Sequence, residues 1–291
     1  MKRWHATTGL AITTLAVCGL LAAVPRAAAQ EKPKPAEAAK SDEKLPKAED
    51  IIDKSIEAMG GKAAMEKVRT RVLKGTLEVQ PQGIKGTFIA YTAAPNKSYE
   101  IVEMEGAGKE EAGTDGDVYW TISTAMGPRL LEGEEKDTKV RETAFNAELQ
   151  WRKLYPKAEC TEIADVDDHP CYKVVFTPAT GAPVTTYYDK KTYLPVKQET
   201  TLSSPMGKMA LTTLLEDYQK SDAVMIAHRM TTLVAGAPIK QIVVLEQVEQ
   251  NTDIPADRFA PPEPVKALLA KSKAETKPAT AEKEKKAEPK P

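Results

Sequence analysis

The sequence predicts an α+β protein that is mainly β, in which a curved antiparallel sheet forms an incomplete (half) β-barrel and helices cover its concave side. Two observations carry this prediction. Ten or more short segments rich in Val, Ile, Thr, Tyr and Phe are separated by turn residues, and helix-period segments stand before and between them. A meander of so many strands exceeds the usual length of an open twisted sheet, so we expect it to curl.

The folded part opens with a predicted amphipathic helix over residues 46–59. Gly60 and Gly61 follow it and supply the left-handed backbone that ends many helices. A second, short helical segment is predicted over residues 62–68. The apolar face of the first helix is formed by Ile51, Ile52, Ile56 and Met59.

Strands are predicted on both sides of a central helix. This helix covers residues 134–151, which contain no Gly or Pro and are rich in Glu, Lys, Arg and Ala, and we expect it to lie across the sheet. The strands before it are predicted at 71–79, 84–91, 97–102 and 117–122. The strands after it are predicted at 157–164, 171–177, 184–189, 194–201, 208–219, 227–234 and 239–248.

Segments of distinct composition flank the folded part. Residues 1–29 have the basic start, apolar middle and small-residue end of a secretory signal peptide, with cleavage expected after Ala29. Alternatively the signal is of the lipoprotein type with Cys18 as the lipidated residue, although Val17 is a poor residue before such a cysteine. We predict a disordered Pro/Lys/Glu/Ala linker at 30–46, the folded domain at 47–270, and a disordered tail of similar composition at 271–291.

Composition argues against several functional classes. Lys and Arg (41) almost cancel Asp and Glu (42) among the 291 residues, so no general attraction to nucleic acid is expected. The three histidines, His5, His169 and His228, leave few bases for catalysis and few ligands for zinc. Beyond the signal, no stretch approaches the roughly 18 apolar residues of a spanning helix. We therefore expect no catalytic residue, no metal, no cofactor and no membrane-spanning segment.

Two cysteines fall on adjacent predicted strands, on either side of a turn at residues 165–168. An exported protein passes through an oxidising compartment, so we predict a structural disulfide between Cys160 and Cys171. Such a bridge contributes about 3 kcal/mol to stability. A redox-active pair is the alternative, but disulfide exchange favours the closer Cys-x-x-Cys spacing.

Neighbouring acidic residues are interpreted as solvated charge. Glu110 and Glu111 are adjacent in the sequence, and adjacent residues of a strand point to opposite sides of the sheet. They therefore cannot face one gap, as the paired carboxylates of an acid-base catalyst must. The same interpretation is given to Glu134 and Glu135.

Apolar side chains of the strands have two possible roles. Residues of one parity face one side of the sheet, where they form the core of a flat sheet or line a cavity for an acyl chain in a strongly curved one. Methionine suits an adaptable lining, although it also fills ordinary cores. The candidate cavity residues are Phe88, Trp120, Tyr188, Met206, Met209, Leu211 and Met225.

Several short motifs follow one another in a characteristic order. They are Met59-Gly60-Gly61, Lys74-Gly75, DGDVYW at 115–120, YDKKTYL at 188–194, LEDY at 215–218 and NTDIPADRF at 251–259. In this order, after an export signal, they resemble the outer-membrane lipoprotein-sorting proteins of the LolA/LolB-like superfamily. The resemblance covers about residues 48–264.

The resemblance implies a half barrel over helices, with a hydrophobic cavity that shields the acyl chain of a lipid or lipoprotein in the periplasm. We therefore expect an exported, soluble, non-catalytic carrier that works as a monomer in the periplasm. Its expected partners are an acyl chain and proteins of the envelope. Two alternatives stay open: a structural or interaction domain of the same fold with a filled core, and an accessory module of a periplasmic hydrolase.

Overall fold

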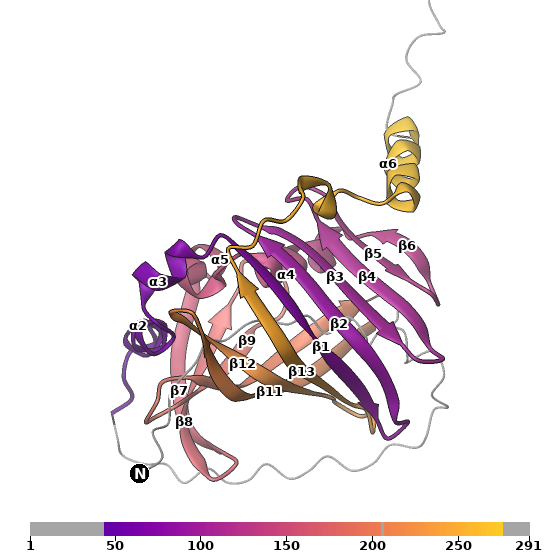
Figure 1. Cartoon of the computed structure of the whole chain (residues 1–291). Helices are drawn as coiled ribbons and strands as arrows, with labels where there is room; N and C mark the ends of the chain where they lie inside the picture. Colours follow the sequence, from indigo (N-terminus) through magenta and orange to yellow (C-terminus); the bar gives the residue numbers. More distant parts are fainter. Residues whose placement is uncertain (1–43, 205–206, 276–291) are drawn as a thin grey trace, which may run out of the picture.

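The computed structural model describes residues 44–204 and 207–275 of the chain. Within these residues one antiparallel sheet of 13 strands dominates the fold (Figure 1). In chain order the strands are β1 (Thr70–Gln80), β2 (Ile84–Ala93), β3 (Lys97–Met104), β4 (Gly108–Thr114), β5 (Tyr119–Ser123), β6 (Gly127–Leu130), β7 (Lys157–Val166), β8 (His169–Thr177), β9 (Val184–Asp189), β10 (Pro195–Ser204), β11 (Gly207–Ser221), β12 (Val224–Val234) and β13 (Lys240–Gln250).

The strand order shows how two sets of strands form one sheet. From edge to edge it is β6-β5-β4-β3-β2-β1-β13-β12-β11-β10-β9-β8-β7. The first arm, β1 to β6, and the second arm, β7 to β13, are each a meander, and they join where β1 pairs with β13. The edge strands β6 and β7 do not pair with each other, so the curved sheet is an unclosed barrel, which confirms the predicted fold class.

The junction between the arms depends on a glycine. The register between β1 and β13 shifts between Lys74 and Gly75. A Cβ atom on Gly75 would lie 2.0 Å from the carbonyl oxygen of Val244 on β13. Only a residue without a side chain fits this bulge, which explains the Lys74-Gly75 motif in physical terms.

The helices lie beside the sheet and within its curve. Helices α2 (Ala48–Ala58) and α3 (Lys62–Lys67) lie near β7 and β8 (Figure 1). A Cβ atom on Gly60, where α2 has ended, would lie 2.3 Å from the carbonyl oxygen of Ala223, so the helix end packs directly on the β11–β12 turn. Helices α4 (Gly133–Thr143), η2 (Ala147–Gln150) and α5 (Trp151–Leu154) connect the two arms and occupy the concave side.

Four elements differ from the sequence-based expectation. Strands β4 and β6 lie in segments that we had not predicted as strands, because their sequences contain Gly, Pro and charged residues. The predicted helix 134–151 is interrupted after α4, where Asn146 adopts a left-handed backbone (φ 50°). After η3 (Ala256–Phe259), an additional helix α6 (Glu263–Glu275) extends from the sheet near β6 (Figure 1).

Apolar side chains form two large clusters. The arm cluster spans β3, β2, β1, β13, β12 and β11 and includes Leu73, Phe88, Val102, Leu211, Met230 and Val243. The helix cluster lies where α2, α3, η2 and α5 cover β7 to β9 and includes Ile51, Met59, Met65, Trp151, Val174 and Tyr188. The space between the helices and the sheet therefore lies beside both clusters.

The predicted disulfide is wrong, because both cysteines are free thiols in the structure. In the β7–β8 hairpin Cys171 pairs with Ala164, whereas Cys160 pairs with Val174, and the register shifts between Cys160 and Glu162. The two cysteines are therefore separated by several residues along the strands, about 10 Å at 3.3 Å per residue. A disulfide needs Cα atoms within about 7 Å.

Candidate functional site

A cavity of about 160 Å³ lies between the helices and the concave face of the sheet. Both layers contribute apolar side chains to its wall. The helices supply Ile52, Ile56, Met59 and Trp151, and the sheet supplies Phe176, Val184, Tyr188, Leu215 and Met230. The amphipathic face of α2 thus serves as one wall of the cavity, while the second arm serves as the opposite wall.

Aromatic contacts hold the wall in place at one end of the cavity. The ring of Trp151 meets the ring of Phe176 edge-on, with 6.3 Å between the ring centres. The ring of Tyr155 lies 5.2 Å from the same Phe176 ring. Because Trp151 is the first residue of the short helix α5 and Tyr155 directly follows that helix, these contacts fix α5 against β8.

The wall also contains the half-buried acidic residues Glu142 and Glu148. Burial raises the pKa of Glu148, and the nearby positive charge of Arg71 opposes this shift. Burial likewise lowers the pKa of Arg71 to about 10, and Glu148 opposes that shift in turn. The guanidinium of Arg71 lies 5.2 Å from the ring centre of Phe145 and donates a hydrogen bond to Asn146. Arg71 therefore stays protonated at neutral pH and stabilises the Glu148 carboxylate.

Burial and the charge of Glu148 also affect two tyrosines, Tyr188 and Tyr218. Burial, and secondarily the charge of Glu148, raises the pKa of Tyr188. The same two causes raise the pKa of Tyr218, whose hydroxyl donates a hydrogen bond to the carbonyl oxygen of Pro195. Both phenols therefore stay neutral, and neither serves as a base at physiological pH.

Two hydrogen-bond donors of the wall are unused. The hydroxyl of Ser55 and the indole N–H of Trp151 are buried and have no hydrogen-bond partner within the described part of the chain. A buried polar group without a partner costs about 1–3 kcal/mol. Both residues line the larger cavity.

A second cavity, of about 80 Å³, is also lined by residues of α4. Thr138 and Glu142 of α4 line both cavities, so the two spaces adjoin at this helix. Lys139, also on α4, is buried and lies 3.7 Å from the carboxylates of both Glu100 and Glu142. Glu110 faces this cavity from β4.

The interpretation of Glu110 as solvated charge is wrong. Its side chain lies on the concave face, since it pairs with Val102 on β3 and Ser123 on β5, and it is 5% exposed. Its neighbour Glu111 lies on the other face, where it accepts a hydrogen bond from the hydroxyl of Tyr99. The two carboxylates point to opposite sides as predicted, but Glu110 is buried instead of solvated.

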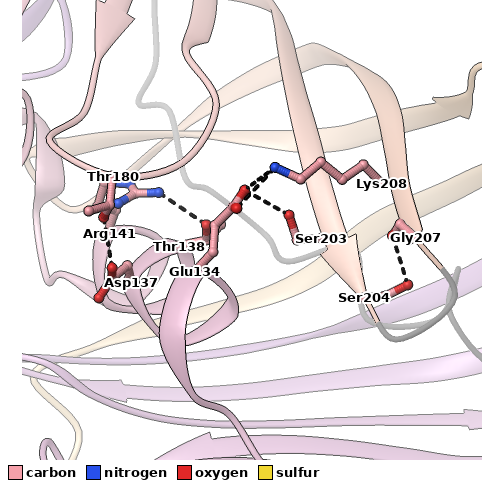
Figure 2. A network of polar contacts seen from close by, with 9 residues as sticks. All are labelled: Glu134, Asp137, Thr138, Arg141, Thr180, Ser203, Ser204, Gly207 and Lys208. Carbon is pink, nitrogen blue, oxygen red and sulfur yellow. Dashed lines mark hydrogen bonds and ion pairs between the residues drawn. The ribbon is translucent and has the colours of Figure 1, made fainter.

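Hydrogen bonds and an ion pair attach α4 to the second arm (Figure 2). The Glu134 carboxylate accepts a hydrogen bond from Ser203 at 2.9 Å and pairs with the Lys208 ammonium at 2.7 Å. These bonds hold the pKa of Glu134 below its usual range. The Asp137 carboxylate accepts a hydrogen bond at 2.7 Å from Thr180, in the loop between β8 and β9. Helix α4 is therefore attached to the second arm mainly through exposed polar groups.

No protein-family model matches the sequence, and no curated protein matches it. The solved structures that are similar in fold include the following two. A DUF1329 family protein from Desulfovibrio piger is 11% identical with a TM-score of 0.51, over 72% of this chain and 96% of that chain. A LolA superfamily protein from Nitrosomonas europaea is 14% identical with a TM-score of 0.51, over 75% of this chain and 99% of that chain. The fold is LolA-like.

The LolA-like sheet distributes the predicted cavity residues over several places. Tyr188 lines the larger cavity. Phe88 and Leu211 are buried in the arm cluster, and Met209 packs against it. Met225 is buried beside the end of α2, where its backbone N–H donates to Met59. Met206 lies outside the described residues.

Trp120 lies on the opposite face of the LolA-like sheet from Phe88. It pairs with Gly113 on β4, which in turn pairs with Tyr99 on β3. Its ring centre lies 5.8 Å from that of Tyr99, and only 1% of its surface is exposed. Trp120 therefore belongs to an aromatic cluster outside the curve and away from both cavities.

Sequence reasoning missed most of the polar wall of the LolA-like half barrel. The apolar residues Ile52, Ile56 and Met59 had a signal, since they share the helical face that covers the concave side. Glu142 and Glu148 had none, because acidic residues on a helix ordinarily face solvent. Their burial follows from the position of α4 and η2 between the two arms.

Two kinds of feature are absent from residues 44–204 and 207–275. No helix in these ranges is long and apolar enough to cross a membrane. No group of three or more His, Cys, Asp or Glu side chains in these ranges has an arrangement that could hold a metal ion.

Proposed function

We propose that this protein is an exported, non-catalytic carrier of the cell envelope that binds the acyl chain of a lipid or lipoprotein in the larger cavity. The observation that carries the proposal is the apolar wall formed jointly by α2, α5 and the second arm, around about 160 Å³ of space in a LolA-like fold. An acyl chain placed there leaves water, and each buried CH₂ contributes about 0.8 kcal/mol.

A full acyl chain needs more room than the cavity offers in this conformation. An apolar cavity of about 150 Å³ holds one benzene molecule. Loading therefore requires α4, together with the loop between β8 and β9, to move outward. The contacts of Glu134 with Lys208 and of Asp137 with Thr180 are mostly exposed, and an exposed ion pair contributes only about 0–1 kcal/mol. Such a movement therefore costs little free energy, and α4 acts as a lid over the cavity.

The unused donors favour an acyl group over a plain hydrocarbon. The carbonyl oxygen of a fatty acid or ester accepts hydrogen bonds, and Ser55 and Trp151 each have a donor without a partner in the described residues. Each bond formed to a previously unpaired buried donor removes a cost of about 1–3 kcal/mol.

We also propose that the carrier works in the periplasm as a monomer. The signal-like composition of residues 1–29 supports export, and these residues lie outside the described part of the chain. Its further partners would be envelope proteins that deliver or accept the lipid.

A cavity-filling variant tests the proposal. Ala182, in the loop between β8 and β9, lines the larger cavity, whereas Ala179 in the same loop is exposed. We expect the full chain to bind a fluorescent fatty-acid analogue with roughly micromolar affinity. Ala182→Trp should weaken this binding about tenfold or more by filling the cavity, and Ala179→Trp should leave it unchanged. Equal binding by both variants, or no binding by the wild type, would contradict the proposal.

A further inference from the structure

The smaller cavity contains more charge than an apolar ligand requires. Its wall includes Glu110, Arg129, Glu135, Lys139 and Glu142, together with the apolar side chain of Leu202. Its volume of about 80 Å³ exceeds the space that a single water molecule needs, which is about 10–15 Å³. All of these charged residues except Glu110 have an oppositely charged neighbour within 4 Å among the described residues.

One ion pair and one group of three charges account for most of the charges beside the cavity. The Arg129 guanidinium lies 2.7 Å from the Glu135 carboxylate, in a pair that is neutral overall. The Lys139 ammonium lies between Glu100 and Glu142, at 3.7 Å from each. One ammonium thus serves two carboxylates, which already leaves an excess of negative charge beside the cavity.

Glu110 adds to this excess and has no partner among the residues that the structure describes. No hydrogen bond or ion pair reaches its carboxylate from the residues that the structure describes, although only 5% of the residue is exposed. Burial alone raises its pKa to about 7. A buried carboxyl group without a partner is expensive, and the natural complement to it is a positively charged hydrogen-bond donor.

We propose that the smaller cavity binds the primary ammonium group of an amphiphile, with the Glu110 carboxylate as its main acceptor. The ligand class is an aminoalkyl lipid, and this inference rests on the proposed function because the acyl chain would occupy the larger cavity. Thr138 and Glu142 line both cavities. One molecule is therefore able to extend past α4 with its chain on one side and its headgroup on the other.

The ammonium group has two possible sources, a lipid headgroup or a small free amine. Three probes separate them in calorimetric titrations of the full chain at pH 7.5: dodecylamine, dodecanol of the same chain length, and ethylamine without a chain. Dodecylamine should bind at least about tenfold more tightly than dodecanol, because only the amine pairs with Glu110. Ethylamine should bind more weakly than dodecylamine. Ethylamine binding as tight as that of dodecylamine would overturn the lipid assignment and indicate a free amine.

A matched pair of variants locates the preference. Glu110→Gln should bring dodecylamine to within about twofold of dodecanol, while dodecanol binding stays at the wild-type level and so reports an intact fold. Glu103→Gln removes an exposed carboxylate of β3 and should keep the full preference for the amine. Equal binding of dodecylamine and dodecanol to the wild type would overturn the ammonium site even if Glu110→Gln did not fold.

The result also separates this inference from the proposed function. If dodecanol binds and the amine gains nothing, the acyl-chain carrier stands and the ammonium site is wrong. If dodecanol does not bind but ethylamine binds in a Glu110-dependent way, the ammonium site stands and the carrier proposal is wrong. If none of the three probes binds, both are wrong.

Discussion

Glu110 shows how one side chain changes character with its position in the sheet. It sits beside Glu111 in a charged stretch of β4, and the two residues differ only in the face on which they lie. Glu111 pairs with Lys109 at 2.7 Å and accepts a hydrogen bond from Tyr99, whereas Glu110 is buried without such partners in the described residues. The pKa of Glu110 rises to about 7 for this reason.

The raised pKa makes stability depend on pH. A carboxyl group whose pKa is higher in the folded state binds its proton more tightly there, so its ionisation destabilises the fold as the pH rises from about 4.5 through about 7. Glu110→Gln cannot ionise. We expect the variant to gain about 2 kcal/mol relative to wild type between pH 5 and pH 8, as measured by urea unfolding without ligand.

The comparison isolates Glu110 from its charged surroundings. Lys139 and Glu142 of α4, and the Arg129–Glu135 pair, face the same cavity and titrate in both proteins, so their effects largely cancel in the difference. A stability difference between variant and wild type that is the same at pH 5 and pH 8 would show that Glu110 is not buried as the structure describes.

For single residues, the sequence correctly predicts the side of the sheet to which a side chain points, but it does not predict how deeply that side chain is buried. Strict alternation along a strand correctly predicted that Glu110 and Glu111 point to opposite sides. It could not predict that the face of Glu110 is covered by α4, because the helix reaches it from a segment some thirty residues later. Trp120 and Phe88 illustrate the same limit. Alternation shows which residues of one strand lie on the same face, but not which residues of the neighbouring strands lie on that face with them. The pairing register gives this information.

Helix α4 is the element that connects the two arms. Its buried Lys139 pairs with Glu100 of the first arm, and its exposed Glu134 binds Ser203 and Lys208 of the second arm (Figure 2). The two attachments differ in exposure, which means that the end of α4 near the second arm opens more easily.

We predict that Glu134→Ala loosens α4 without unfolding the protein. Amide hydrogen exchange within Gly133–Thr143 should accelerate several-fold, because the attachment to β10 and β11 is lost. The free energy of global unfolding should change little, because exposed ion pairs contribute little to stability. Lys62→Ala, which removes the exposed Lys62–Glu66 pair of α3, should leave exchange in α4 unchanged. Unchanged exchange in α4 of Glu134→Ala would show that these contacts do not hold the lid.

At the element scale the sequence predicts regular strands well and irregular positions poorly. Alternating or β-branched segments such as 184–189 coincide with strand β9, while β4 and β6 lack that pattern. The disulfide prediction failed at a similar irregularity, because the register shift beside Cys160 moves it away from Cys171. Spacing in the sequence contains no information about such a shift.

For the whole molecule, the sequence predicts the curled sheet but does not predict the volume of the cavity. The number of strands and the shortness of their turns predicted a single curled sheet with helices on its concave side, as the structure has it. The volume left between the layers was not predictable. It depends on how α4, η2 and α5 sit between the arms, and the same apolar pattern serves a filled core and an open cavity.

The central claim is that the space between helices and sheet holds an acyl chain, and native mass spectrometry tests it most directly. The full chain would be produced with its N-terminal segment in a bacterium, purified without detergent and measured before and after addition of phospholipid and fatty acid. We predict bound masses of fatty acids or phospholipids that Ala182→Trp lacks and Ala179→Trp keeps. A chain that remains without bound mass after lipid is added would contradict it and favour an interaction domain with a filled core.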